Sequence, residues 1–183
     1  MSRLRRPIGA DDHVLGRADA RVALVEYGDY QCPFCGTAHV EVAKVLRQTG
    51  ELTQYAFRHF PLTQVHPDAL LAAQAAEAAG VQGKFWEMHD ILFSNQGALD
   101  RLDLLAYAEA LRLDVARFAE ELRSGAHLER VTRDVHTGVR SGVNGTPTFF
   151  LNASRFDDRW DAPNLVAAIA AAAEGEPRRI SGA

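Results

Sequence analysis

Residues 21–35 have the sequence RVALVEYGDYQCPFC, and this stretch predicts the point where a strand passes into a helix. Its first seven residues are mostly apolar and prone to form β structure, and they end at Gly28, as is typical of a central strand. Cys32 then lies at or near the start of a helix. Pro33 suits the first helical turn, where the missing N–H would have no partner in any case. The cysteine pair therefore lies at the amino end of a helix.

Helical spacing continues from Pro33 to Gln48, and an alternating run from Leu52 to Phe60 predicts a second strand. Strand, helix and strand in this order form a βαβ unit, whose strands are parallel and whose crossover is right-handed. The chain from Pro67 to about Arg123 has only helical patterns, with Asp100 and Asp114 as candidate N-caps. We therefore predict an inserted helical subdomain at about residues 66–125.

The remaining patterns complete an α/β fold of order β-α-β, helical insertion, α-β-β-α. The predicted elements are a helix at about 126–141, strands at 148–151 and near 155–156, and a helix at about 163–174. Residues 13–174 are predicted to form a single domain, with flexible segments at 1–12 and 175–183.

Composition excludes several classes of function. The chain has 183 residues, 47% of them apolar and 24% charged, with a net charge of -4. Basic residues are scattered, so no stripe suited to nucleic acid is present. The basic amino terminus has no apolar run behind it, and no run is long enough to span a membrane. We expect a cytoplasmic, monomeric protein with neither nucleic-acid nor membrane partners.

The two cysteines, Cys32 and Cys35, are the only ones in the chain. A framework of structural disulfides and a four-cysteine zinc or iron–sulfur site are therefore excluded. Attachment of c-type haem requires His directly after the second Cys, where this chain has Gly36. A CxxC pair beside a βαβ pattern instead favours redox chemistry.

The position of Cys32 favours its thiolate form. Free N–H groups and the positive end of the helix dipole stabilise a negative sulfur there, whereas an unperturbed thiol titrates near ~8.5. Cys35 lies one turn further into the helix, within reach of a mixed disulfide formed on Cys32. We predict Cys32 as the nucleophile and Cys35 as the resolving thiol. The sulfur atoms carry the electrons, so no cofactor is implied.

Two alternatives to redox chemistry remain open for this pair. Both thiols could be inert and buried. Alternatively, Cys32, Cys35 and His39 have C-x2-C-x3-H spacing, which allows a metal site if His59, His66 or an acid supplies the fourth ligand. No metal ligand is predicted at the site, and structural roles are expected for His39, His89 and the other histidines.

Glu26 and the pair Thr146–Pro147 are further candidates. An acid within a central parallel strand is expected to be buried, which raises its pKa and makes Glu26 a candidate proton acceptor for Cys35. The alternative is a strand-end carboxylate turned to water. A proline after Asn-Gly is usually part of a turn. In a functional interpretation, a cis bond presents the backbone of Thr146 beside Cys32 to an extended substrate.

The chain resembles the DsbA-like branch of the thioredoxin superfamily. The similarity covers about residues 12–173 and is carried by VEYGDYQCPFC at 25–35, HFPL at 59–62, GKFWEMH at 83–89 and GVNGTPTFF at 142–150. It implies a cis bond at Thr146–Pro147, an insertion that caps the active site, and a Cys32/Cys35 pair that cycles between dithiol and disulfide. It also places Glu26 where the family keeps a buried acid.

The chain departs from the strongly oxidising periplasmic members, which have Pro-His between their cysteines where this chain has Pro33-Phe34. Thr146 before the key proline is more typical of isomerase-like and Gram-positive-type relatives. Phe34 is expected either to contact apolar substrate or to pack against the insertion, and the substrate-binding set is Pro33, Phe34, Thr146 and Pro147.

The predicted function is thiol–disulfide exchange with protein or peptide substrates, or with a low-molecular-weight thiol, supported by an unidentified recycling partner. A redox-sensing regulatory module is the main alternative, because DsbA-like domains also occur attached to membrane transporters. A CxxC/His metal-binding domain is the other. The direction of exchange does not follow from the sequence.

Overall fold

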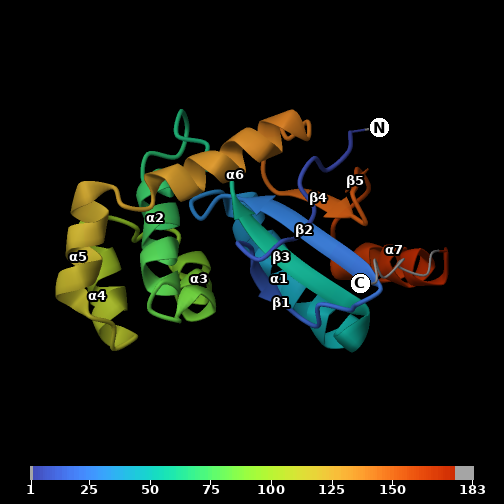
Figure 1. Ribbon diagram of the computed structural model, residues 1–183, viewed down its shortest axis with the longest axis horizontal. Coiled ribbons are helices and arrows are strands. Elements are labelled where there is room, and N and C mark those ends of the chain that lie inside the picture. Colours follow the sequence, from blue (N-terminus) through green and yellow to red (C-terminus); the bar gives the residue numbers. More distant parts are fainter. Residues whose placement is uncertain (1, 176–183) are drawn as a thin grey trace.

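The computed structural model describes residues 2–175, which form one sheet surrounded by helices (Figure 1). Its strands are β1 (His13–Leu15), β2 (Val22–Gly28), β3 (Thr53–His59), β4 (Thr148–Leu151) and β5 (Ser154–Phe156). Its helices are α1 (Pro33–Thr49), α2 (Ala69–Gly80), α3 (Phe85–Ser94), α4 (Arg101–Ala110), α5 (Val115–Ser124), α6 (Leu128–Arg140) and α7 (Ala162–Gly175), and the short 3-10 helix η1 (Gly50–Leu52) precedes β3.

The sheet has the order β1-β3-β2-β4-β5, with β2 at its centre. β2 pairs with β3 in parallel and with β4 antiparallel. The parallel pair joined by α1 confirms the predicted βαβ unit and, with the antiparallel β4 and β5, the thioredoxin-like α/β fold. Because β2 and β4 run in opposite directions, Tyr27 near the end of β2 faces Thr148 at the start of β4. The segment before β4 therefore lies at the same end of the strands as the start of α1.

Both faces of β2 are buried, as expected for a central strand. Val22 and Leu24 point into a core shared with α1, α7 and the insertion, and this core contains both cysteines. Val25 and Tyr27 point to the opposite core, which Phe60 and Phe150 share. Side chains alternate between the two faces of a strand, so Glu26 lies on the cysteine side of the sheet.

Helices α2–α5 form the predicted insertion between β3 and α6, and lie on the left of Figure 1 with α7 on the right. The predicted N-caps are confirmed: the Asp100 carboxylate accepts from the backbone N–H groups of Leu102 and Asp103, and the Asp114 carboxylate accepts from that of Arg117. Helix α3 contacts both α1 and α2, so the insertion is attached to the core through the helix that carries the dithiol.

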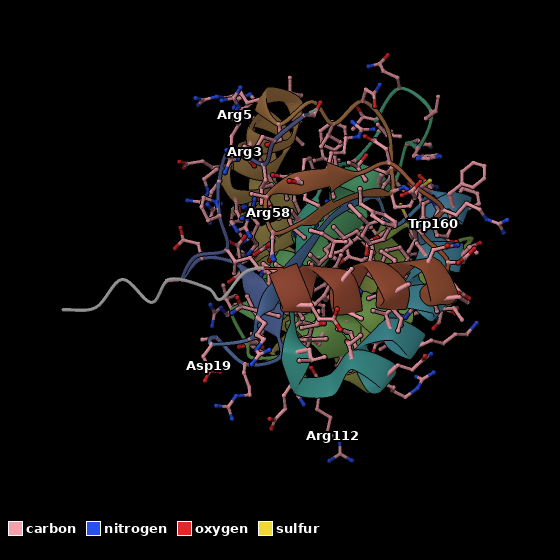
Figure 2. The ribbon with its side chains drawn as sticks, turned by 90° about the vertical axis from the view of Figure 1, so that its right-hand side faces the viewer. Arg3, Arg5, Asp19, Arg58, Arg112 and Trp160 are labelled. Carbon is pink, nitrogen blue, oxygen red and sulfur yellow. The ribbon has the colours of Figure 1, made fainter. Side chains whose placement is uncertain are left out.

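The amino-terminal segment corrects the prediction that residues 1–12 are flexible. Among the described residues of this segment, Leu4 is buried and its backbone N–H donates to the carbonyl of Ala153. Arg58, which lies in the interior in Figure 2, donates to the carboxylate of Asp12 at 2.9 and 3.0 Å and to the Arg6 carbonyl. The sequence also did not predict β1, whose three residues are too few to show an alternating pattern.

Apart from Gly175, which ends α7, the predicted flexible tail at 175–183 lies outside the described residues. Within residues 2–175, no helix combines the length and the apolar character needed to cross a membrane.

Candidate active site

The turn between β2 and α1 is held by the buried carboxylate of Asp29. One oxygen accepts from the backbone N–H of Gln31 at 2.8 Å, and the other accepts from that of Leu62 and lies 2.8 Å from His66 Nδ1. The turn itself and the loop that follows β3 therefore converge on one side chain. The backbone that enters Cys32 is fixed before the helix begins.

Gln96, in the insertion, holds the same turn from the other side. Its side-chain amide donates to the carbonyls of Tyr30 and Cys32, both at 2.8 Å. A Cβ at Gly36 would lie 2.2 Å from the Gln96 side-chain oxygen, so this approach requires glycine at position 36. The sequence analysis missed Gln96, because no local sequence pattern predicts that a polar loop residue contacts a residue far away in the chain.

Cys32 is the N-cap residue of α1 and Pro33 occupies its first turn, as predicted. The pKa of Cys32 is lowered to about 5, chiefly by a hydrogen bond from the Cys35 thiol. Burial opposes this shift, while Thr146 and the backbone N–H groups of Cys35 and Phe34 add to it. The helix start therefore stabilises the thiolate as predicted, but the second sulfur contributes more.

Cys35 is fully buried, and the pKa of its thiol is raised far above the usual range. Burial is the main cause, and the hydrogen bond to Cys32 and the charge of Glu26 act in the same direction. The two sulfurs therefore differ at neutral pH: Cys32 carries a negative charge and Cys35 keeps its proton. This combination places a thiolate in contact with a proton-bearing thiol.

Glu26 is buried, with 1% of its surface exposed. Burial raises its pKa to about 7, although a hydrogen bond from the Tyr55 hydroxyl to Oε2 at 2.7 Å lowers it in part. Its other oxygen, Oε1, is buried without a hydrogen-bond partner among the described residues. The carboxyl group therefore exchanges a proton near neutral pH and has one oxygen free to accept it.

Thr146 and Pro147 lie beside Cys32. The peptide bond between them is cis, and the Thr146 carbonyl oxygen lies 3.5 Å from Cys32 Sγ. Phe34 is 67% exposed at the tip of the CxxC turn, so it does not pack into the insertion. The structure thus brings the predicted substrate-binding residues to one surface around Cys32.

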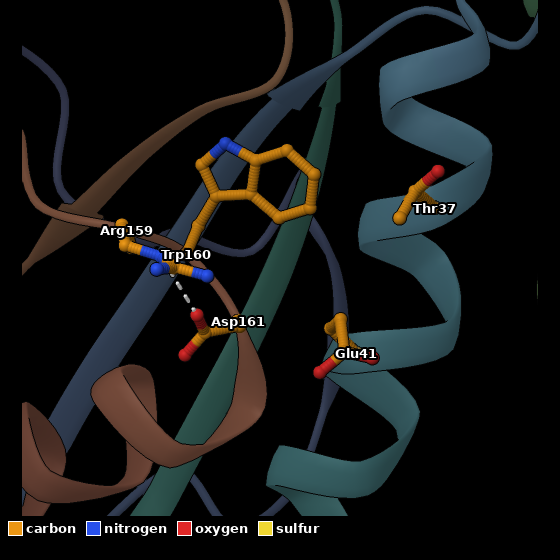
Figure 3. Close-up of a pocket in the computed structure, with 5 residues that line it drawn as sticks. All are labelled: Thr37, Glu41, Arg159, Trp160 and Asp161. Carbon is orange, nitrogen blue, oxygen red and sulfur yellow. Dashed lines mark ion pairs between the residues drawn. The ribbon is translucent and has the colours of Figure 1, made fainter.

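A pocket opens on the neighbouring face of α1. It has a volume of about 460 Å³ and is lined by Thr37, Glu41, Arg159, Trp160 and Asp161. Figure 3 shows the Trp160 indole extending toward α1 from the connection between β5 and α7, next to the Arg159–Asp161 ion pair. Thr37 follows Cys32 by five positions and donates to the Pro33 carbonyl, so the pocket begins close to the dithiol.

The metal interpretation of the CxxC pair finds no support in the geometry. Within residues 2–175, the side chains close enough to share an ion are His39, His89 and Asp90, and neither cysteine is among them. The other proposed ligands, His59 and His66, are paired with the carboxylates of Glu77 and Asp29 instead.

The sheet order, the dithiol at the start of α1 and the helical insertion define a class. Together these features make the fold of DsbA-like thiol–disulfide oxidoreductases, with two cysteines close to each other at the start of α1. The chain belongs to the thioredoxin family, whose sequence model matches residues 9–171.

Two curated relatives are named as transport proteins. Na(+)/H(+) antiporter NhaA 1 of Salinispora arenicola is 48% identical over 170 residues, which are 92% of this chain and 26% of that protein. Na(+)/H(+) antiporter NhaA 1 of Mycolicibacterium vanbaalenii is 44% identical over 172 residues, which are 92% of this chain and 28% of that protein. The chain thus spans about a quarter of the length of the curated relatives it matches.

Solved structures show the same fold. A thioredoxin-like oxidoreductase from Silicibacter pomeroyi has a TM-score of 0.81 and 24% identity, covering 92% of this chain and 95% of that one. Oxidised BdbD from Bacillus subtilis has a TM-score of 0.78 and 24% identity, covering 88% and 92%. The alpha-DsbA1 protein of Wolbachia pipientis has a TM-score of 0.78 and 19% identity, covering 93% and 94%.

Proposed function

We propose that this chain is a thiol–disulfide oxidoreductase that exchanges disulfides with protein or peptide substrates, or with a low-molecular-weight thiol, through Cys32 and Cys35. The observation that carries the proposal is the opposite shift of the two cysteine pKa values in a pair of contacting sulfurs. Only the thiolate is nucleophilic, so this pair begins the reaction at Cys32.

The exchange takes place in two displacements. The Cys32 thiolate attacks one sulfur of a substrate disulfide, forms a mixed disulfide and expels the other substrate sulfur as a thiolate. Cys35 then loses its proton and attacks Cys32, which forms the protein disulfide and releases the second substrate sulfur. The substrate gains two electrons and the protein dithiol loses them. The reverse sequence oxidises a substrate dithiol.

Glu26 supplies the base for the second displacement. Cys35 must lose its proton in a buried site, and the negative charge of Glu26 already acts on this thiol. With a pKa raised to about 7, the carboxylate can take up the proton and release it again near neutral pH.

Substrate binds around the exposed turn. Thr146 offers its backbone to an extended peptide beside Cys32, and such strand-like pairing recognises a peptide without regard to its sequence. Pro33, Phe34 and Pro147 add apolar contacts. Because each turnover leaves the Cys32–Cys35 pair in the opposite redox state, a second thiol or disulfide partner must restore it.

The test uses both directions of exchange. Wild-type protein should accelerate reduction of insulin by dithiothreitol or oxidation of reduced ribonuclease A, and Cys32→Ser should abolish the effect. The matched variant Cys35→Ser keeps the nucleophile, so it should form a mixed disulfide with one equivalent of a chromogenic disulfide and then stop. Absence of exchange in both assays, or full activity of Cys32→Ser, would contradict the proposal.

A second function is favoured by the relatives. They are named as Na(+)/H(+) antiporters, and this chain matches only about a quarter of their length. In this alternative, the dithiol is a redox-sensing module that acts on a transport protein. Such a module would equilibrate with a glutathione buffer through Cys32 and Cys35 but would not turn over repeatedly on insulin or ribonuclease A. Repeated turnover would favour the enzyme.

A further inference from the structure

Two histidines and one aspartate converge between α1 and α3. His39 comes from α1, one helical turn after Cys35, while His89 and Asp90 come from α3 of the insertion. One potential ligand atom of each lies within 4.8 Å of the other two. His39 Nε2 and Asp90 Oδ1 are 3.6 Å apart. Thiol exchange uses none of the three.

The chemistry of these donors selects a class of ion. Imidazole nitrogens together with one carboxylate suit Zn²⁺, Ni²⁺ and Co²⁺, whereas Mg²⁺ and Ca²⁺ favour oxygen ligands alone. Tetrahedral ligands around zinc lie about 3.3 Å apart, given zinc–ligand distances of about 2 Å. The Asp90 side chain is 67% exposed, so it can rotate to close the remaining gap.

His89 has a hydrogen-bond partner on one ring nitrogen. It is 3% exposed, and its Nδ1 lies 3.0 Å from the Tyr30 hydroxyl. A metal-bound histidine usually donates its other ring N–H to a neighbouring acceptor, which fixes the ring and the tautomer. Tyr30 can accept from Nδ1, and Nε2 is then free to bind the ion.

His39 is held in place but remains accessible. Its ring stacks on Phe93 with the centroids 5.0 Å apart, and its side chain is 23% exposed. An ion can therefore enter from the solvent side through His39 and Asp90 and reach the buried His89. Three protein ligands leave the fourth position to water.

We propose that His39, His89 and Asp90 bind a divalent transition-metal ion that joins α1 of the core to α3 of the insertion. The ion clamps the helix that carries the dithiol to the helical subdomain. This site is separate from the proposed exchange chemistry, so either can be present without the other.

The test measures zinc binding in the absence of the thiols, which bind zinc themselves. In a Cys32→Ser/Cys35→Ser variant, titration calorimetry with Zn²⁺ should give one site per chain. Adding His39→Ala or Asp90→Asn should weaken binding more than about tenfold. The control, His136→Ala, removes an exposed histidine on α6 outside the cluster and should leave binding unchanged.

Two further measurements avoid substitution of the buried His89. Tyr30→Phe removes no ligand but should weaken zinc binding about 10- to 100-fold, because the ring loses its acceptor. Co²⁺ bound to the Cys32→Ser/Cys35→Ser variant should show the visible absorption of four-coordinate cobalt, and adding His39→Ala should abolish this absorption. The proposal would be overturned if the thiol-free chain failed to bind Zn²⁺. It would also be overturned if the His39→Ala and Asp90→Asn variants bound Zn²⁺ as tightly as the thiol-free chain.

Discussion

Single side chains determine the chemistry of the dithiol, and Cys35 has the largest effect on Cys32. Its thiol donates to the Cys32 sulfur and lowers the pKa of Cys32 more than Thr146 or the backbone does. Alkylation of Cys32 by iodoacetamide should therefore follow a midpoint near pH 5. Cys35→Ala removes the donor and should raise that midpoint by about one to two units.

Cys35→Ser is the matched control for this measurement. A serine hydroxyl can still donate to the Cys32 thiolate, so the midpoint should rise less than in Cys35→Ala. Alkylation rates followed by mass spectrometry across the pH range distinguish the two variants. Equal midpoints in wild type and Cys35→Ala would assign the acidity of Cys32 to the helix start alone.

Glu26 should make the protein less stable as pH rises. Its pKa is raised from 4.5 to about 7 in the folded protein, so between these values the folded state binds more protons than the unfolded state. The contribution of Glu26 to the free energy of unfolding therefore falls with increasing pH across this window, by about 3 kcal/mol in total. Urea unfolding of wild type and Glu26→Gln at about pH 5 and pH 8 measures this loss as a difference, because Cys32 titrates in both proteins.

Glu26→Gln should remove this pH dependence, because glutamine does not titrate, and its side-chain oxygen can still accept from Tyr55. The variant should gain about 1–3 kcal/mol over wild type at about pH 8 and little at about pH 5. If Glu26 is the base for Cys35, the variant should also slow the second displacement. A stability difference between wild type and Glu26→Gln that stays the same at these two pH values would show that Glu26 titrates normally.

Loops and helix ends position the active-site turn, and Gln96 is the clearest case. Gln96→Ala removes the donor to the partly buried Tyr30 carbonyl and one of three donors to the Cys32 carbonyl, and it should cost about 1–3 kcal/mol of unfolding free energy. Gln82→Ala is the control, since Gln82 also makes two hydrogen bonds, both to the exposed backbone of Asp114. Its cost should be smaller in urea unfolding. An equal loss of unfolding free energy in the two variants would mean that the partly buried hydrogen bonds of Gln96 stabilise the fold no more than the exposed ones of Gln82.

The amino-terminal segment is anchored by an ion pair between Arg58 and Asp12, whose side chains have no exposed surface. Arg58→Met removes both hydrogen bonds from the guanidinium to this buried carboxylate, which keeps only the longer ion pair with Arg6 and the Gly9 N–H, and it should cost about 3–5 kcal/mol in urea unfolding. Arg17→Met removes an exposed pair with Asp19 and should leave the unfolding midpoint nearly unchanged. A small effect of Arg58→Met would mean that the segment is not part of the cooperative fold.

Much of this molecule could be predicted because its central features are periodic. The apolar run of β2, typical of a central strand covered on both faces, predicted that Glu26 is buried, and the strand–CPFC–helix order placed Cys32 at a helix start. The fold followed from the order of such patterns. These features repeat along the chain, so local spacing reveals them.

The contacts that were missed join residues far apart in the sequence. Gln96 reaches Cys32 across 64 positions, and the guanidinium of Arg58 binds the carbonyl of Arg6 across 52. Each depends on one polar side chain and on backbone acceptors, which any residue provides. The strand β1 has three residues, too few for a pattern. Such contacts require coordinates.

The redox state of the dithiol should control the stability of the folded chain. In the reduced protein the pKa of Cys32 is lowered to about 5, below the ~8.5 of an unfolded thiol. The lowered pKa stabilises the folded protein fully above pH ~8.5, and this stability is lost progressively as the pH falls to about 5. The disulfide form has no thiolate and lacks this contribution. The reduced form should therefore gain stability over the oxidised form as pH rises from about 5 to about 8.

Urea unfolding of both forms at about pH 4.5 and about pH 7.5 tests this difference. The titration of Glu26 affects both forms in the same direction, so comparing reduced with oxidised protein isolates the contribution of Cys32. A Cys32→Ser/Cys35→Ser variant should lose the contribution of Cys32 and keep that of Glu26. Because a more stable reduced form makes the disulfide a stronger oxidant, a difference that grows with pH would favour oxidation of substrates. A constant difference would show that the thiolate does not stabilise the fold.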